Sequence, residues 1–359
     1  MIPRVLSLYV AKRFAATLVL ILAAVGFVIF LADYVEVLRR FSDDEGFSPL
    51  LGLQLAAMRV PILLDTALPF AFLFAAVLSL IGLSRTLELV VARASGVSVW
   101  GFLRGPFAVA ALFGALATTV LNPFAVDLKE KAENIEAELS GRSGWGEGHW
   151  FRQEGKSIPS IVHAGSAGDE EGLALFGVTA FVLDADGGFS EKVTAPRASY
   201  EDQGWIFRNA KVVSATSSPK NVERYELPTD LSAEELRRSF VEPEAISVWS
   251  LPGFIATAQL TGVDPDGFRV AFHVLLTRPL FLIAMVMIAA TVSLRLSRYG
   301  GIWKLVLTGA AIGFLLYAAS EIVSDIGGNG IIDPVLAAWL PPLVALLFGA
   351  TALLYQEDG

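Results

Sequence analysis

Long stretches without charged side chains constrain the fold of this chain more than any other feature of its sequence. Four such runs cover residues 14–32, 66–84, 105–126 and 334–355. A helix crosses a bilayer with about 17–25 apolar residues, so each run predicts a membrane-spanning helix. Two further runs are less clear. His273 and Arg278 interrupt residues 270–294, and the run at 305–320 is shorter. We therefore expect six spans, in two groups of three.

The composition agrees with a membrane protein and excludes several other classes. The chain is 54% hydrophobic and only 18% charged, whereas about 25% of a soluble domain is charged. The net charge of −9 gives no support for a nucleic-acid partner. The absence of cysteine excludes disulfides and cysteine-based zinc or redox sites. The first apolar run is longer than a signal-peptide core and lacks a following cleavage site, so we expect it to remain as an anchor.

The short loops predict the orientation of the spans. One set of loops is basic and the other is mainly acidic, apart from Arg39 and Arg40. The positive-inside rule therefore places both termini in the cytoplasm and residues 127–266 outside. The basic residues on the inner side are Arg4, Lys12, Arg13, Arg85, Arg93, Arg104, Arg295, Arg298 and Lys304.

The outer segment has the alternating pattern of β-strands. Residues 178–183 alternate, and residues 198–200 and 205–213 are typical of a hairpin, with weaker strands at 147–151 and 157–163. We expect an all-β domain of about 100 residues, a sandwich or jelly-roll. A capping box beginning at Ser232 predicts a short helix in the same segment.

These patterns divide the chain into three parts. Residues 1–126 hold spans one to three, residues 127–266 hold the β-domain with its connecting helices, and residues 267–359 hold spans four to six. The predicted fold class is a membrane α-helical protein with an inserted all-β domain.

Residues 84–98 lie between spans two and three and are too polar for the bilayer interior. At 100° per residue they form a short amphipathic helix, with Gly96 as its C-terminal stop. One interpretation is an interfacial turn, and the other is a surface that presents Glu88 to a cytoplasmic partner. The apolar face contains Leu87, Val90, Val91 and Ala94, and the other face contains Arg85, Glu88, Ala92 and Ser95.

No catalytic or metal-binding pattern is present, and we predict no cofactor. The histidines His149, His163 and His273 are scattered, without a His-Glu-x-x-His motif. A Gly-Lys-Ser sequence at 155–157 lacks the first glycine of a phosphate-binding loop, because Trp150 occupies that position. Any ATP hydrolysis must therefore come from a partner chain.

Charged residues near the spans are more informative, because a charge at the bilayer centre costs about 2.5–3.5 kcal/mol on insertion scales. Arg39, Arg40, Arg59 and Arg278 are expected at one depth, on the outer-leaflet side. The planar fork of arginine suits phosphate and carboxylate groups, so these residues are candidates for binding an anionic lipid headgroup. The alternative interpretation is that their side chains only extend to the interface.

A family resemblance follows from these features. Residues 83–97 read LSRTLELVVARASGV. This segment resembles the cytoplasmic coupling helix of the lipopolysaccharide-export permeases, the LptF/LptG family, and is more similar to the LptG branch. Three spans, an inserted β-domain and three more spans are also that family's layout. The chain departs from the family pattern at Asp33, where a lysine is frequent.

The resemblance implies an inner-membrane permease subunit of an ABC transporter, not an enzyme. Such a subunit extracts lipopolysaccharide from the outer leaflet and passes it to a periplasmic β-jelly-roll bridge. The implied partners are an LptB-type ATPase dimer, the homologous permease LptF, and LptC and through it LptA. The implied ATPase contacts are Arg85, Glu88, Leu89 and Arg93.

Two other functions stay open on the sequence alone. One is a membrane-anchored lipid-modifying enzyme that uses Asp33 or Asp65. The other is a scaffold or receptor whose β-domain binds a partner, in which Glu88 is dispensable. Only the transporter requires an acidic residue that faces a cytoplasmic ATPase.

Overall fold

The structure is a computed structural model. It describes residues 2–42, 46–140, 149–153, 159–164, 166–168, 173–184, 188–201, 204–214, 219–229, 243–261, 264–295 and 302–358. The chain divides into two compact units, and each is described by itself. The first comprises Met1–Leu38, Gly52–Lys129 and Ile246–Gly359, and the second comprises Arg39–Leu51 and Glu130–Ala245.

The first unit is a helical bundle. Six helices are long and apolar enough to cross a membrane, which confirms the predicted number of spans. The helices are α1 (Ile2–Phe41), α2 (Pro49–Arg85), α3 (Glu88–Ala94), α4 (Val99–Leu116), the π-helix η1 (Ala117–Leu121), α5 (Asn122–Ser140), the 3₁₀ turn η2 (Pro243–Ala245), α7 (Leu251–Thr261), α8 (Asp266–Arg295), α9 (Ile302–Gly328) and α10 (Pro334–Asp358). The second unit contains η2, the last residues of α1 and α5 and the first residues of α2.

The bundle is held by close packing of apolar side chains and by small residues at helix contacts. Phe14 of α1 packs edge-on against Phe72 of α2, whose side chain is fully buried. At Gly105 of α4 the backbones themselves approach, because a Cβ atom there would lie 2.2 Å from the carbonyl oxygen of Ser7 on α1. Glycine at position 105 therefore serves packing between helices of the same chain.

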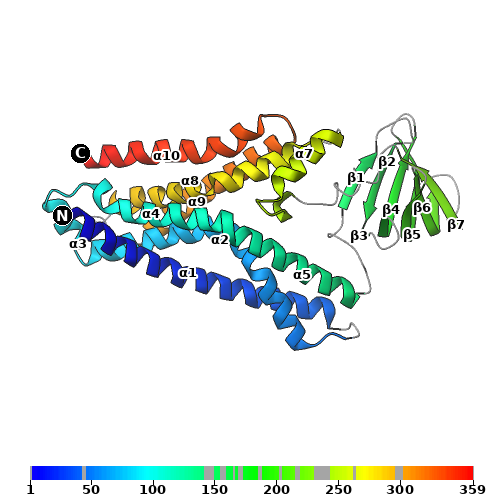
Figure 1. Ribbon diagram of the computed structural model, residues 1–359, viewed down its shortest axis with the longest axis horizontal. Helices are drawn as coiled ribbons and strands as arrows, with labels where there is room; N and C mark the ends of the chain where they lie inside the picture. The colour runs from blue at the N-terminus through cyan, green and yellow to red at the C-terminus, as the bar shows by residue number, and fades with distance from the viewer. Residues whose placement is uncertain are drawn as a thin grey trace. The chain divides into compact units, whose positions relative to one another are not determined.

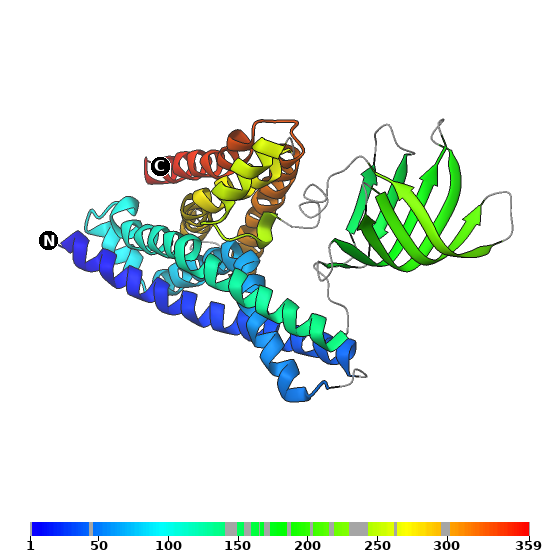
Figure 2. The same cartoon turned by 45° about the vertical axis from the view of Figure 1, so that its right-hand side comes forward.

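Both chain termini and α3 lie at the same end of the helical unit, as the two ribbon views show (Figures 1 and 2). An even number of spans requires this arrangement, since each pair of spans returns the chain to its starting side. The segment between spans two and three is therefore on the same side as the termini.

The second unit contains an antiparallel sheet. Its strand order is β1-β2-β4-β5-β6-β7, and β3 also pairs with β4. The described strands follow one another up and down, which confirms an inserted all-β segment. Their bounds are β1 (His149–Gln153), β2 (Ser160–Ala164), β3 (Ser166–Gly168), β4 (Ala174–Leu183), β5 (Phe189–Glu201), β6 (Gly204–Ser214) and β7 (Lys220–Pro228).

The sheet has the alternating burial expected from its sequence. Val193, Trp205 and Phe207 are fully buried in its apolar core. The predicted hairpin is confirmed, with Tyr200 opposite Trp205 in the β5–β6 ladder. The short helix predicted from Ser232 lies outside the described residues.

Candidate functional site

The junction between α2 and α3 is a sharp break in the helix. Leu87 adopts a left-handed conformation with φ of 60°, and α3 begins at Glu88. The sequence predicted a helix across residues 84–98, but the observed helix contains only Glu88–Ala94. A leucine has no intrinsic preference for positive φ, so this break escapes prediction by propensity. Gly96, with φ of +81°, ends the helix region as predicted.

The face of α3 that packs on the bundle differs from the predicted one. Leu89 and Ala92 are buried, and Leu89 belongs to a cluster that includes Leu83 and Phe102. Ala92 had been assigned to the polar face, and this assignment was wrong. Leu87 and Val91 are instead 61% and 66% exposed. The side chain of Leu89 therefore anchors α3 to its own chain, and the exposed apolar side chains are Leu87 and Val91.

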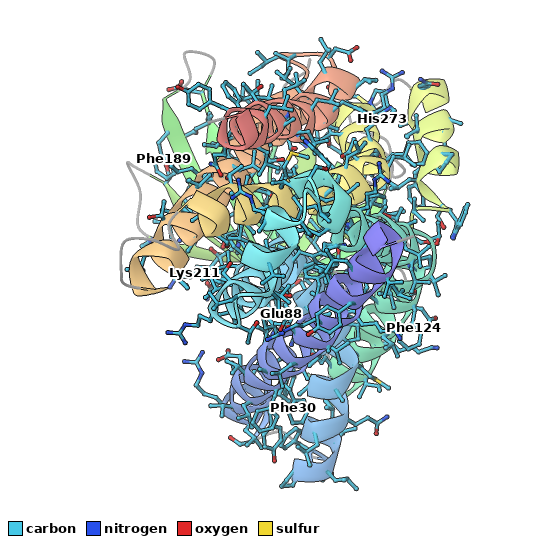
Figure 3. All side chains as sticks on the ribbon, turned by 90° about the vertical axis from the view of Figure 1, so that its left-hand side faces the viewer. Phe30, Glu88, Phe124, Phe189, Lys211 and His273 are labelled. Atoms are coloured by element: carbon cyan, nitrogen blue, oxygen red, sulfur yellow. The ribbon has the colours of Figure 1, made fainter. Side chains whose placement is uncertain are left out.

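Glu88 lies beside α1 (Figure 3) and is bound from two sides. Its Oε1 accepts hydrogen bonds from Oγ1 of Thr86 at 2.8 Å and from Nη1 of Arg13 at 3.3 Å. These contacts lower the pKa of Glu88, the Thr86 hydrogen bond most, with smaller contributions from Tyr9 and Arg13 and some opposition from burial. The carboxylate is therefore ionised and oriented at neutral pH, and a third of its side chain stays exposed.

The two predicted arginines of this segment are exposed. Arg85 is the last residue of α2 and Arg93 is in the last turn of α3. Together with Leu87, Val91 and the exposed part of Glu88, they form a surface with both charged and apolar groups. We call these five residues the α3 surface. Such a mixture is typical of protein interfaces.

An open cavity of about 650 Å³ lies between α1, α2 and α9. Its wall is mostly apolar, but α1 contributes two acidic residues, Asp33 and Glu36. The other lining residues are Ile29, Ala32, Leu63, Thr66, Ala67, Phe70 and Tyr317. An apolar cavity with few polar groups is the usual form of a binding site for an amphipathic molecule.

Asp33 pairs with one of the predicted headgroup residues. Its Oδ1 lies 3.7 Å from Nε of Arg59 on α2. Its Oδ2 is buried and accepts no hydrogen bond within the part of the chain that the structure describes. The charged residues that line the cavity are thus the acidic Asp33 and Glu36, and Arg59 approaches it through Asp33.

Arg278 of α8, another candidate headgroup residue, pairs with an acidic residue of α2. Its guanidinium forms two hydrogen bonds of 2.7 Å with the two carboxylate oxygens of Asp65 on α2. Both side chains are more than four-fifths buried. The sequence makes Arg278 a candidate for lipid binding and Asp65 a candidate for catalysis. Both groups are occupied by one another here, so neither is available as predicted without breaking the pair.

A backbone hydrogen bond that α8 lacks next to Arg278 is replaced by one from another helix. Pro279 has no N–H group, so it leaves the carbonyl of Leu275 without its partner in α8. Thr118 in the π-helix η1 donates a buried hydrogen bond of 2.7 Å to that carbonyl. One turn before, a Cβ at Gly114 would lie 2.6 Å from Cα of Pro279, so only glycine fits this contact.

Arg39 and Arg40 end α1 and belong to the second unit. Both side chains are exposed, and the guanidinium of Arg40 lies 5.4 Å from the ring centre of Phe41. Arg59 and Arg278 bind separate acids, while Arg39 and Arg40 lie on the exposed last turn of a helix.

Several contacts of the site were missed in the sequence. The loop charges marked Arg13 only as a topology signal, and Thr118 gave no signal of its own. The missing N–H of Pro279 does predict that some donor must reach Leu275, but not which one. Within the described residues no group of three metal-ligating side chains occurs.

Six apolar helices in two groups of three, with an antiparallel sheet inserted between the groups, define a multi-pass membrane protein with an inserted all-β segment. The sequence model for "Lipopolysaccharide export system permease LptF/LptG" matches residues 8–355. The chain belongs to this family, a family of transport permeases of the inner membrane.

Two relatives show how far this similarity extends. The chain is 23% identical to the lipopolysaccharide export system permease protein LptG of Escherichia coli K12 over 352 residues, which is 94% of each chain. It is also 23% identical to the LptG protein of Haemophilus influenzae over 314 residues, covering 81% of this chain and 82% of the relative. The similarity therefore includes the membrane helices and the inserted sheet.

Proposed function

We propose that this chain is an LptG-type permease subunit that extracts lipopolysaccharide from the outer leaflet of the inner membrane, driven by a separate ATPase. The lipopolysaccharide then passes to a periplasmic β-jelly-roll bridge. The observation that supports this most strongly is the α3 surface, which presents Glu88 and two arginines at the end of the bundle that holds both termini.

The partners in this proposal are an LptB-type ATPase dimer, the homologous permease LptF, and LptC with LptA beyond it. The ATPase would receive the α3 surface. Leu87 and Val91 supply apolar contact area, and Glu88, Arg85 and Arg93 supply charge complementarity. The buried Leu89 then acts as the anchor of α3 rather than as a contact.

The proposed orientation of the chain in the membrane places the basic loops on the cytoplasmic side. Both termini and α3 lie in the cytoplasm, and the sheet lies in the periplasm. The part of α1 that lines the cavity would then lie at the depth of the outer leaflet. The apolar wall of the cavity would contact the acyl chains of lipopolysaccharide there.

The arginines proposed to contact the substrate differ in whether an acidic side chain of the same chain already binds them. Arg39 and Arg40 are exposed and suit the phosphate groups of the headgroup. Arg59 lies 3.7 Å from Asp33, so a substrate phosphate would compete with that carboxylate for the guanidinium. Arg278 is held by two hydrogen bonds of 2.7 Å and would contact substrate only after its pair with Asp65 opens.

Co-purification tests the proposal. The tagged chain is expressed from its native locus, solubilised in detergent, and its partners are identified by mass spectrometry. We expect an ATPase and a second six-span permease, and loss of the ATPase on Glu88→Arg. The matched control is Glu223→Arg, which reverses an exposed acidic residue on β7. A chain that purifies alone, or an unchanged complex with Glu88→Arg, would exclude this function and reopen the enzyme and scaffold hypotheses.

A further inference from the structure

Helix α1 contacts two sites that lie far apart along it. Near its start, Nη1 of Arg13 binds Oε1 of Glu88 on α3 at 3.3 Å. Twenty residues later, Asp33 of the same helix lines the cavity. Helix α1 runs without a break from Ile2 to Phe41. One continuous helix therefore joins the α3 surface to the cavity.

The place of Arg13 is set by its surroundings. Its Nη1 also lies 3.3 Å from the hydroxyl of Tyr9, one turn earlier on α1. On the α2 side, a Cβ at Gly82 would lie 3.2 Å from Nη2 of Arg13. Glycine at this position leaves room for the guanidinium between α1 and α2. Arg13 is therefore packed in place rather than extended freely toward a headgroup.

Helix α3 depends on such contacts for its orientation. It has seven residues and follows the left-handed Leu87, and helices of this length are not stable by themselves in water. Leu89 packs in a cluster that also contains Val10 of α1, and Glu88 adds to this packing an ion pair with Arg13 and a hydrogen bond from Tyr9, both on α1. A contact at the first residue of the helix controls the direction in which the helix leaves the break.

We infer that Arg13 is a positioning residue that holds Glu88 and links the movement of α3 to α1. This inference rests on the proposed function and deepens it, because it adds a direct path from the ATPase-facing surface to the helix that lines the cavity. A force on α3 reaches α1 through the carboxylate, without passing through α2.

Spin-label distances on the full-length chain test the link without any partner. The chain contains no cysteine, so Ala16→Cys on α1 and Ala94→Cys on α3, both exposed positions, can be labelled without background. In lipid nanodiscs, Arg13→Gln should broaden the distance distribution and shift it to longer values. The control is Lys12→Gln, which removes the exposed neighbouring charge. Equal distributions for Arg13→Gln and Lys12→Gln would overturn the inference.

A second variant acts on the same contact without changing any charge. Gly82→Leu fills the space that the guanidinium occupies and should reproduce the broadening of Arg13→Gln.

Arg13→Lys should retain most of the wild-type distribution, because it keeps a charged donor. The double exchange Arg13→Glu with Glu88→Arg should restore the distribution. Failure of both the lysine variant and the exchange would show that the packing of Arg13, not its pairing with Glu88, matters.

The transport step is then measured in the complex with the ATPase. Arg13→Gln should leave the ATPase bound and hydrolysing ATP, but lower the lipopolysaccharide moved per ATP several-fold. If Arg13→Gln and Lys12→Gln moved equal amounts of lipopolysaccharide per ATP, the proposed role of Arg13 in transport would be contradicted. If the wild-type chain binds no ATPase, the proposed function fails, whereas the spin-label experiment still decides whether Arg13 orients α3.

Discussion

Arg278 and Asp65 join α8 to α2 through a two-pronged ion pair in which both hydrogen bonds measure 2.7 Å. Removal of one member of such a buried pair leaves the other charge without a partner. This costs more than the pair itself contributes, because neither water nor another charge replaces the lost partner.

The first prediction concerns this pair. Arg278→Met should destabilise the chain by about 3 kcal/mol, because Asp65 is left buried and charged. Arg278→Met with Asp65→Leu should recover most of that loss. Thermal unfolding in detergent measures both. A single variant as stable as the wild type would show that Asp65 does not depend on Arg278. An equal loss in the single and the double variant would show that the packing of Arg278, not the ion pair, sets the stability.

The second prediction concerns the backbone carbonyl of Leu275, which lacks its partner in α8 because of Pro279. Thr118→Val keeps the shape of the side chain but removes the donor to Leu275, at a cost of about 1–3 kcal/mol. Thr118→Ser should be close to wild type. In the background of Pro279→Ala, the new backbone N–H of residue 279 can bind the Leu275 carbonyl, so Thr118→Val should then cost much less. An equal cost in both backgrounds, measured by thermal unfolding, would exclude this explanation.

The third prediction separates the two apolar sides of α3. Val91→Glu changes an exposed residue, so it should leave thermal stability unchanged and abolish co-purification of the ATPase. Leu89→Ala should lower stability by about 2–5 kcal/mol because it removes a buried side chain. A stable Leu89→Ala chain would contradict the burial of this residue. Retained ATPase with Val91→Glu would remove Val91 from the interface.

The fourth prediction is a pH dependence. Hydrogen bonds from Thr86, Tyr9 and Arg13 hold the pKa of Glu88 below its ordinary value of 4.5. A lowered pKa means that the contribution of the ionised carboxylate is present above the ordinary value and is lost as pH falls through the lowered pKa. The spin-label distance between α1 and α3 should therefore stay constant from neutral pH down to 4.5 and broaden only below it. A change between neutral pH and 4.5 would point to another titrating group.

The fifth prediction concerns the substrate. Arg39→Glu with Arg40→Glu should lower the stimulation of ATP hydrolysis by lipopolysaccharide about tenfold, since each charge-assisted hydrogen bond is worth about 1.5–3 kcal/mol in a buried setting and less here, where the side chains are exposed. The control is Lys220→Glu, an exposed charge reversal on β7. Unchanged stimulation would show that both arginine side chains only extend to the membrane–water interface.

The number and order of the spans were predictable because they depend only on the length of the apolar runs. The break at Leu87 was not, because a leucine at positive φ gives no sequence signal. The partners of Arg59 and Arg278 were not predictable either. A pair between α2 and α8 depends on how far each helix is shifted along its axis, and hydropathy does not fix that shift to within one turn.

The face of α3 shows the same limit on a smaller scale. Helical periodicity grouped Leu87 with Val91 correctly, since both are exposed. It could not say whether that group or the one containing Leu89 would pack on the bundle. The bundle itself made that choice, through the space left beside Leu83 and Phe102.

The contact at Gly105 has a mechanical consequence. Between α4 and α1 no layer of side chains separates the two backbones at this point, because even a methyl group would collide with the carbonyl of Ser7. Side chains can change rotamer and allow neighbouring helices to slide, but two backbones in direct contact have no such freedom. The first part of α1 and the first part of α4 should therefore tilt together as one body, and a rotation of α1 alone would first have to separate them.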